Sequence, residues 1–244
     1  MTSNPMHQFE VYRIGPEIKL GMVNLSFTNA SLFMAISALT ILLLLFFGTK
    51  KKLLIPSKLQ LVTEMSYTFI AKMINNTAGS NAKAFFPFIF TLFMFVLFCN
   101  MVGMLPYSFT VTSHIIVTFA LAASIFIGVT IIGFIKHGIK YLELFIPKGV
   151  PFYILPLIVV IEIISYLSRP VSLSVRLFAN MMAGHTMLKV FGGFVISLGL
   201  LGGWLPLGFS VALTGLEILI AFLQAYVFAI LTCIYLNDAL NLHH

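Results

Sequence analysis

The chain has 244 residues, of which 60% are hydrophobic and 9% are charged, and its mean hydropathy is +1.06. About a quarter of the residues of a soluble globular protein are charged, so this chain has too few polar residues to cover a surface in water, and we expect a single all-α integral membrane domain. The formal charge of +7 does not indicate nucleic-acid binding, because nine of the eleven lysines fall in two short connecting segments, 50–83 and 136–148.

Residues 1–28 are polar and show no basic start followed by an apolar core, so no cleavable presequence is predicted. The first apolar run, 29–48, has the about 20 residues that a helix needs to cross a bilayer. Segment 56–76 has apolar residues at helical spacing with charges between them, and Pro56 suits the first helical position. We expect this segment to be an amphipathic helix in the membrane interface; a soluble helix packed on the protein is the alternative.

Two further spans are predicted over 84–105 and 115–135. The link between them has no lysine or arginine, whereas the segment after the second carries Lys136, Lys140 and Lys148. Lysine-rich loops stay on the cytoplasmic or matrix side of a membrane. The N-terminal segment and the link are therefore expected outside, and the C-terminus inside.

The next apolar run, 152–190, would be about 58 Å long as a helix, whereas a bilayer core is about 30 Å thick. Either the run breaks near Pro170 into two short spans, or it forms one steeply tilted helix that is kinked there. Poor turn chemistry favours the tilted helix. The glycine-rich segment 191–208 is expected to form the outer turn, and 209–240 a second long helix antiparallel to the first. The predicted architecture therefore has five membrane-crossing helices and one interfacial helix.

Polar residues recur at heptad spacing in these two long helices: Glu162, Arg169 and Arg176 in the first, and Glu217, Gln224 and Asp238 in the second. Seven residues make nearly two turns, so each set forms one stripe along its helix. Ionisable residues inside a membrane are costly and usually face a water path or pair with one another. The stripes therefore predict a path for ions, and two helices held together by buried ion pairs are the structural alternative.

His185 lies nine residues after Arg176, which places it half a turn out of phase, whereas Asn180 shares the face of Arg176. Two polar faces at two depths indicate two separate aqueous approaches rather than one continuous pore. Arginine stays charged and cannot carry protons, but histidine and carboxylate groups can exchange them. A fixed cation between such groups acts as a barrier to direct proton passage.

The stretch SRPVSLSVRLFANMMAGH, 168–185, resembles the signature of subunit a of the F-type ATP synthase, also called ATP synthase subunit 6. The likeness includes QFEVYRI, LIPSKLQ and the closing LEILIAFLQAYVFAILTCIYLNDAL, and it extends over nearly the whole chain. The pattern of polar residues is similar to that of mitochondrial and alphaproteobacterial-like members.

The resemblance implies a role for each polar position. Arg176 would be the essential cation that faces a rotating ring of small proteolipid subunits, subunit c. The positions matching an outer half-channel are His185, Glu217, Asn180, Gln224 and Asn100. Those matching an inner half-channel are Glu162 and Asp238, with Arg169 and Tyr235 beside them.

The implied function is that of a proton-translocating stator subunit, which is itself not catalytic. The chain lacks a phosphate-binding G-x-x-x-x-G-K-[ST] loop, so we expect no direct nucleotide, and we expect no metal and no cofactor. Expected partners are the proteolipid ring, peripheral stalk subunits, other membrane subunits of the synthase and lipid. The location would be the bacterial inner membrane or, for an organelle-encoded chain, the mitochondrial inner membrane.

Other classes fit less well. A secondary transporter or channel would need broken helices or inverted repeats, and no convincing repeat is found. A structural scaffold would not explain Arg176. Sodium coupling would depend on the ring, which is not part of this chain. Cys99 and Cys233 lie within apolar runs and indicate small core residues rather than a disulfide or metal site.

Overall fold

The computed structural model describes residues 9–15, 19–20, 23–24, 26–50, 55–105, 108–145 and 153–241. Within this part, five helices are long and apolar enough to cross a membrane. They are α1 (Asn29–Lys50), α3 (Phe86–Gly103), α4 (Ile115–His137), α5 (Leu155–Gly202) and α6 (Trp204–Leu240). The predicted all-α membrane class with five long apolar helices is thus confirmed.

Short elements connect or precede these helices. Strands β1 (Lys19–Leu20) and β2 (Val23–Asn24) pair antiparallel, with Lys19 opposite Asn24. Three 3-10 helices lie between the long helices: η2 (Ser80–Phe85), η3 (Val111–Ser113) and η4 (Gly138–Phe145). Of these, η3 matters for the site, because it follows α3 and packs against α5.

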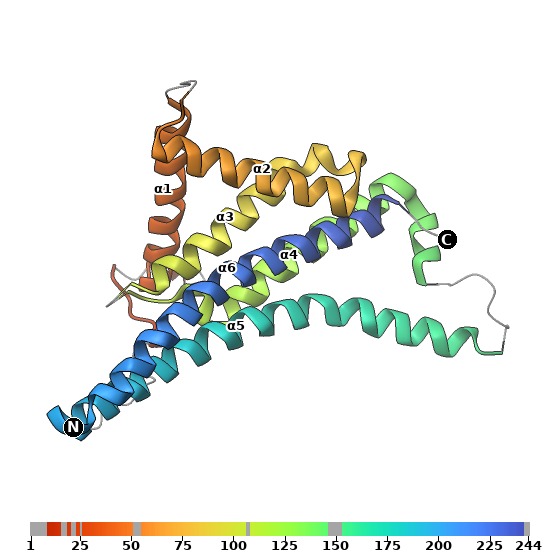
Figure 1. The fold of residues 1–244 in the computed structure, drawn as a ribbon. Coiled ribbons are helices and arrows are strands. Elements are labelled where there is room, and N and C mark those ends of the chain that lie inside the picture. The colour runs from red at the N-terminus through yellow and green to blue at the C-terminus, as the bar shows by residue number, and fades with distance from the viewer. Residues whose placement is uncertain are drawn as a thin grey trace.

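Helix α6 is the centre of the bundle (Figure 1). It runs antiparallel beside α5 and also packs against α3, α4 and α2, while α1 packs against α3. Ala221, Ala225 and Ala229 are fully buried on α6. Such small side chains let neighbouring helices approach closely, which is how helices associate in lipid without a hydrophobic driving force. Cys99 and Cys233 are both free and buried in this core.

Helix α2 (Lys58–Ala78) crosses the end of α1 and lies over α3 (Figure 1). Its first residue is Lys58 and not Pro56, because the Ser57 side chain caps the helix by accepting from the backbone N–H of Gln60 at 3.4 Å. One face packs on the bundle and includes Ile70 and Met73. The remainder of the predicted apolar stripe is exposed: Leu59, Val62, Met65 and Phe69. The helix therefore packs on the protein and still presents an apolar stripe outward.

Helix α5 passes through Pro170 without a break and is bowed along its length (Figure 1). Its φ and ψ leave the helical region at Gly199, where φ is +60°. The chain does reverse within the predicted segment 191–208, between the kink at Gly199 and the start of α6 at Trp204, but the turn is shorter than predicted because α5 stays helical up to that kink. In lipid the backbone needs internal hydrogen bonds, which favours helix even in a glycine-rich segment, and Gly199 alone takes the left-handed conformation there.

The lysine-bearing end of α4 lies against the C-terminal end of α6. Lys136 Nζ donates to the carbonyl oxygen of Leu240 at 2.9 Å, and His137 Nε2 lies 3.2 Å from the same oxygen. Basic groups at a helix C-terminus satisfy its last carbonyls and complement its dipole. The C-terminal ends of α4 and α6 are therefore on the same side of the bundle.

Candidate functional site

Arg176 lies at the middle of α5 with its side chain exposed. Its neighbour Leu177 is fully buried, so α5 turns an adjacent face toward the bundle and leaves Arg176 on its flank. Three small residues share the helix face of Arg176, because they lie one or two turns away from it along α5. They are Ser172, Ala179 and Ala183, and all three are exposed. No hydrogen bond or ion pair involves Arg176 within the described part of the chain.

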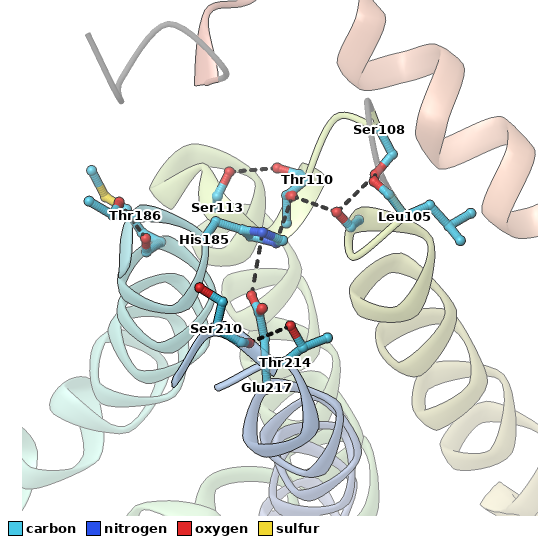
Figure 2. A network of polar contacts seen from close by, with 11 residues as sticks. Leu105, Ser108, Thr110, Ser113, His185, Thr186, Ser210, Thr214 and Glu217 are labelled. Atoms are coloured by element: carbon cyan, nitrogen blue, oxygen red, sulfur yellow. Dashed lines mark hydrogen bonds and ion pairs between the residues drawn. The ribbon is translucent and has the colours of Figure 1, made fainter. Parts of the chain in front are cut away.

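His185 and Glu217 bring α5 and α6 together at a second position (Figure 2). The Nδ1 atom of His185 lies 3.4 Å from Oε1 of Glu217, and both side chains are largely buried, with 11% and 4% of their area exposed. On its other edge, His185 Nε2 lies 2.9 Å from Oγ1 of Thr110. Gly184 gives the carboxyl group room, because a Cβ atom there would lie 2.8 Å from Oε1.

Buried polar atoms continue from this pair along successive turns of α6, at Glu217, Ala221 and Gln224. Asn100 Nδ2 donates to the carbonyl oxygen of Ala221 at 3.3 Å, and Asn180 Nδ2 donates to Oε1 of Gln224 at 3.1 Å. Among the described residues, both carboxyl oxygens of Glu217, Oδ1 of Asn100 and Nε2 of Gln224 are buried without a hydrogen-bond partner. Buried polar atoms normally have partners, and this unused capacity suits a column of water.

The five residues predicted for the outer half-channel therefore lie on α6 or contact it: His185, Glu217, Asn180, Gln224 and Asn100. His185 and Asn180 come from α5, and Asn100 comes from α3. The structure thus brings all five together, and their role in conduction stays a prediction.

A second cluster joins the N-terminal half of α5 to the C-terminal end of α6. Arg169 Nη1 lies 3.2 Å from Oδ2 of Asp238. The guanidinium also lies over two aromatic rings, 5.3 Å from the centroid of Tyr166 and 5.2 Å from that of Tyr235. Cation–π contacts of this kind hold an arginine in place. Three of the four residues predicted for the inner half-channel therefore meet.

Glu162 is the fourth, and it stands apart from this cluster. It lies on α5 seven residues before Arg169, half-buried, with no hydrogen bond or ion pair in the described ranges. Glu162 thus lies on the same helix face as Arg169, but it takes no part in the contacts that Arg169 makes with Asp238 and the two aromatic rings.

Four hydroxyl residues in these clusters were not predicted. Thr110 contacts His185, as described above. The Tyr166 hydroxyl lies 2.8 Å from Oγ1 of Thr130 and 2.9 Å from the hydroxyl of Tyr141. Thr110 comes from the polar link, Thr130 from α4 and Tyr141 from η4, so no spacing along α5 or α6 could have indicated them. Tyr166 lies on α5 but does not share the heptad spacing of the polar residues there.

His114 was also missed. It precedes α4, and its ring stacks on Phe109 with centroids 5.0 Å apart. Its Nε2 atom is buried without a hydrogen-bond partner in the described part of the chain. Burial lowers the pKa of this histidine from its ordinary value.

Comparison with known proteins gives consistent matches over the whole chain. A family model described as ATP synthase A chain matches residues 31–237. The chain is 78% identical to a protein named ATP synthase subunit a from Pelagibacter ubique (strain HTCC1062), over 100% of both chains. It is 56% identical to the protein of that name from Chelativorans sp. (strain BNC1), again over 100% of both chains. It is 58% identical to the one from Rhizobium leguminosarum bv. trifolii (strain WSM2304), over 99% of this chain and 98% of that relative.

Proposed function

Because this chain belongs to the ATP synthase A chain family, we propose that it is the proton-translocating stator subunit in the membrane sector of an F-type ATP synthase. Two offset aqueous half-channels deliver protons to and from a rotating ring of small proteolipid subunits. Arg176 stands between the half-channels and prevents a direct short circuit.

The observation that carries this proposal is the environment of Arg176. It is an exposed guanidinium in the middle of a membrane-spanning helix, with no anion from the described part of its own chain beside it. A charge in the membrane needs a partner or water, so its partner comes from outside this chain. The small residues Ser172, Ala179 and Ala183 on the same face let another helix approach closely. A carboxylate on a ring subunit fits both requirements.

The outer half-channel runs past His185 and Glu217 and along α6 toward Gln224. Its support is the column of buried polar atoms with free hydrogen-bonding capacity. Histidine and carboxylate groups can each take up and pass on a proton. A proton that reaches the ring neutralises a ring carboxylate, and the neutral site can then rotate through lipid.

The inner half-channel passes Asp238, Arg169 and Tyr235, with Glu162 further along α5. Its support is the partly exposed ion pair, whose side chains have 25% and 35% of their area accessible. A ring carboxylate that arrives near Arg176 is favoured in its ionised form by the fixed positive charge. Its proton then leaves through the inner half-channel. Each charge that crosses the potential supplies about 2.3 kcal/mol per 100 mV, which turns the ring.

The orientation follows from the lysines. Lys50 at the end of α1 and Lys136 at the end of α4 belong to lysine-rich connections, and Lys136 lies beside the end of α6. By the positive-inside rule this side faces the cytoplasm, with the N-terminal segment on the outer side. The named relatives are bacterial, which supports a bacterial inner membrane, and the mitochondrial alternative finds no support among them.

The chain has no phosphate-binding loop, so nucleotide chemistry belongs to partner subunits of the same complex. Those partners include the proteolipid ring, peripheral stalk subunits, other membrane subunits and lipid. Proton coupling is preferred over sodium coupling because the polar groups near the half-channels are proton-exchanging. The ring, which would hold any sodium site, decides between the two ions.

Site-specific photo-crosslinking tests the contact with the ring. A photoreactive side chain at Ser172 or Ala183 should link to a small proteolipid subunit in the assembled complex. The matched control is Val171, which is 47% exposed but lies about 140° around the helix from Arg176. Links from Val171 alone, or links from Ser172 and Ala183 to lipid alone, would contradict the proposed orientation of α5.

A further inference from the structure

A continuous set of short polar contacts leads from the link after α3 to the His185–Glu217 pair (Figure 2). Ser108 Oγ lies 2.7 Å from the carbonyl oxygen of Leu105 and 2.8 Å from that of Gly103. Thr110 Oγ1 lies 3.1 Å from the same Gly103 oxygen and 2.9 Å from Nε2 of His185. The hydrogens available to these groups limit which group can donate to which.

Carbonyl oxygens only accept, and each hydroxyl has one hydrogen to donate. If Ser108 donates to Leu105 and Thr110 donates to Gly103, both carbonyl oxygens are satisfied, and Nε2 of His185 must donate to Thr110. The oxygen of Leu105 also accepts from the backbone N–H of Ser108 at 3.1 Å, so the carbonyl oxygens alone do not decide the arrangement, and the proton of a protonated Glu217 does. If Thr110 donated to Nε2 of His185, the imidazole hydrogen would lie on Nδ1 and the proton of Glu217 would find no acceptor there. In the first arrangement that proton is donated to Nδ1, and one more hydrogen bond forms. Because buried polar groups are nearly always paired, the first arrangement is favoured while Glu217 carries a proton.

We propose that Thr110 is a positioning residue that holds the neutral imidazole of His185 in the tautomer protonated at Nε2. The lone pair of Nδ1 then points at Glu217, whose carboxyl group lies 3.4 Å away. Nδ1 is thereby kept open to accept a proton brought by Glu217. In the other tautomer this position would already carry a hydrogen, and the pair could not pass a proton in that direction. The inference rests on the proposed function, in which His185 and Glu217 line the outer half-channel.

The backbone around Thr110 holds this arrangement. Thr110 is 4% exposed, and its carbonyl oxygen accepts from Oγ of Ser113 at 2.6 Å. Gly103 allows the close approach, because a Cβ atom there would lie 2.8 Å from Cγ2 of Thr110. Glu217 is the ionisable group in contact with His185 within the described residues, and Lys189, one turn further along α5, is exposed.

The test compares Thr110→Val, which keeps the shape and removes the hydroxyl group, with Thr110→Ser, which keeps the hydroxyl group. Whole synthase in proteoliposomes is driven at constant membrane potential and constant inner pH while the outer pH is varied. Thr110→Val should lower the rate of ATP synthesis about fivefold, the scale of one lost hydrogen bond. An imidazolium donates a stronger hydrogen bond than a neutral ring, so losing the acceptor at Thr110 disfavours the protonated form of His185. The curve of ATP synthesis rate against outer pH for Thr110→Val should therefore move about half a pH unit or more to lower pH. Thr110→Ser should match the wild type in both rate and profile.

A wild-type rate and profile for Thr110→Val would overturn the inference. So would a Thr110→Ser complex that assembles but is as slow as Thr110→Val, because the hydroxyl group would then not be the cause. If Thr110→Val does not assemble, Thr110→Ala replaces it with the same expected result. His185→Gln is measured in parallel. A full rate for His185→Gln would contradict the proposed half-channel itself, whereas a slow His185→Gln with a normal Thr110→Val contradicts only the role of Thr110.

Discussion

Arg169 and Asp238 form an ion pair across α5 and α6, with Nη1 and Oδ2 separated by 3.2 Å. Arg176 lies on the same helix seven residues later and has no such partner within the described part of the chain. The two arginines share a stripe but not an environment. Arg169 is fixed within its own chain by a carboxylate and two aromatic rings, and Arg176 is left for a group from another subunit.

Asp238→Asn should slow coupled proton pumping by about tenfold or more, because a proton-exchanging group typically contributes about 10²–10⁴-fold. It should change the stability of the complex by about 1 kcal/mol or less, since the pair is partly exposed. The measurement is ATP-driven acidification of proteoliposomes, with a melting curve of the same preparation. Glu64→Gln on α2, whose carboxylate accepts from Gln60, is the control and should pump normally. A normal rate for Asp238→Asn would remove this carboxylate from the path.

Gly133→Ala should destabilise the protein by about 1–3 kcal/mol through overpacking. A Cβ atom at Gly133 would collide with the buried ring of Tyr141, which in turn holds the hydroxyl of Tyr166. Gly128, on the same helix, has nothing within 4 Å of the added atom. Gly128→Ala should therefore be neutral or stabilising by up to about 1 kcal/mol. Equal melting temperatures for the two variants would show that the close packing of Tyr141 is not needed.

Gly184→Ala should leave the complex assembled but slow proton uptake from the outer side. The added methyl group would lie 2.8 Å from the Glu217 carboxyl oxygen and push it away from His185. An open position on the same helix, Gly192, has no atom within 4 Å, so Gly192→Ala serves as the control. We expect a rate several-fold lower for Gly184→Ala and a normal rate for Gly192→Ala. If both variants translocate protons equally, the spacing of His185 and Glu217 does not limit the flux.

His114 should make the fold sensitive to acid. Burial lowers its pKa, so below its ordinary value of about 6.5 the unfolded chain binds this proton more readily than the folded chain, and stability falls as the pH falls. His114→Phe keeps the stacking on Phe109 and removes the titration. Between about pH 7.5 and about pH 5.5, the melting temperature should drop further in the wild type than in His114→Phe. Parallel melting curves would contradict this assignment.

Most of the helical framework could be predicted from the sequence, because an apolar run of about 20 residues has few alternatives to a spanning helix. The extent of the turn within 191–208 could not, since its glycines suggest a long turn in water, whereas the structure keeps a helix up to the kink at Gly199. The apolar stripe of α2 was identified by its spacing, but spacing alone did not tell which part packs on the bundle. Ile70 is buried and Leu59 is 50% exposed.

Heptad spacing placed the polar residues of α5 and α6 on the correct helices and grouped them by face, but it did not give their partners. Arg169 meets Asp238, while Glu162 stays apart. Thr110 lies 75 positions from His185 in the sequence, so their contact depends on how η3 packs on α5. Contacts of this kind are set by tertiary packing, which periodicity along one helix does not encode.

The most direct test of the account is ATP-driven proton pumping by the Arg176→Ala synthase in proteoliposomes. We expect the complex to assemble with its proteolipid ring and pumping to fall to the background, because no fixed cation would then separate the half-channels. Lys189→Ala, which removes an exposed cation on the same helix, should pump normally. Coupled pumping by Arg176→Ala at the wild-type rate would contradict the central claim.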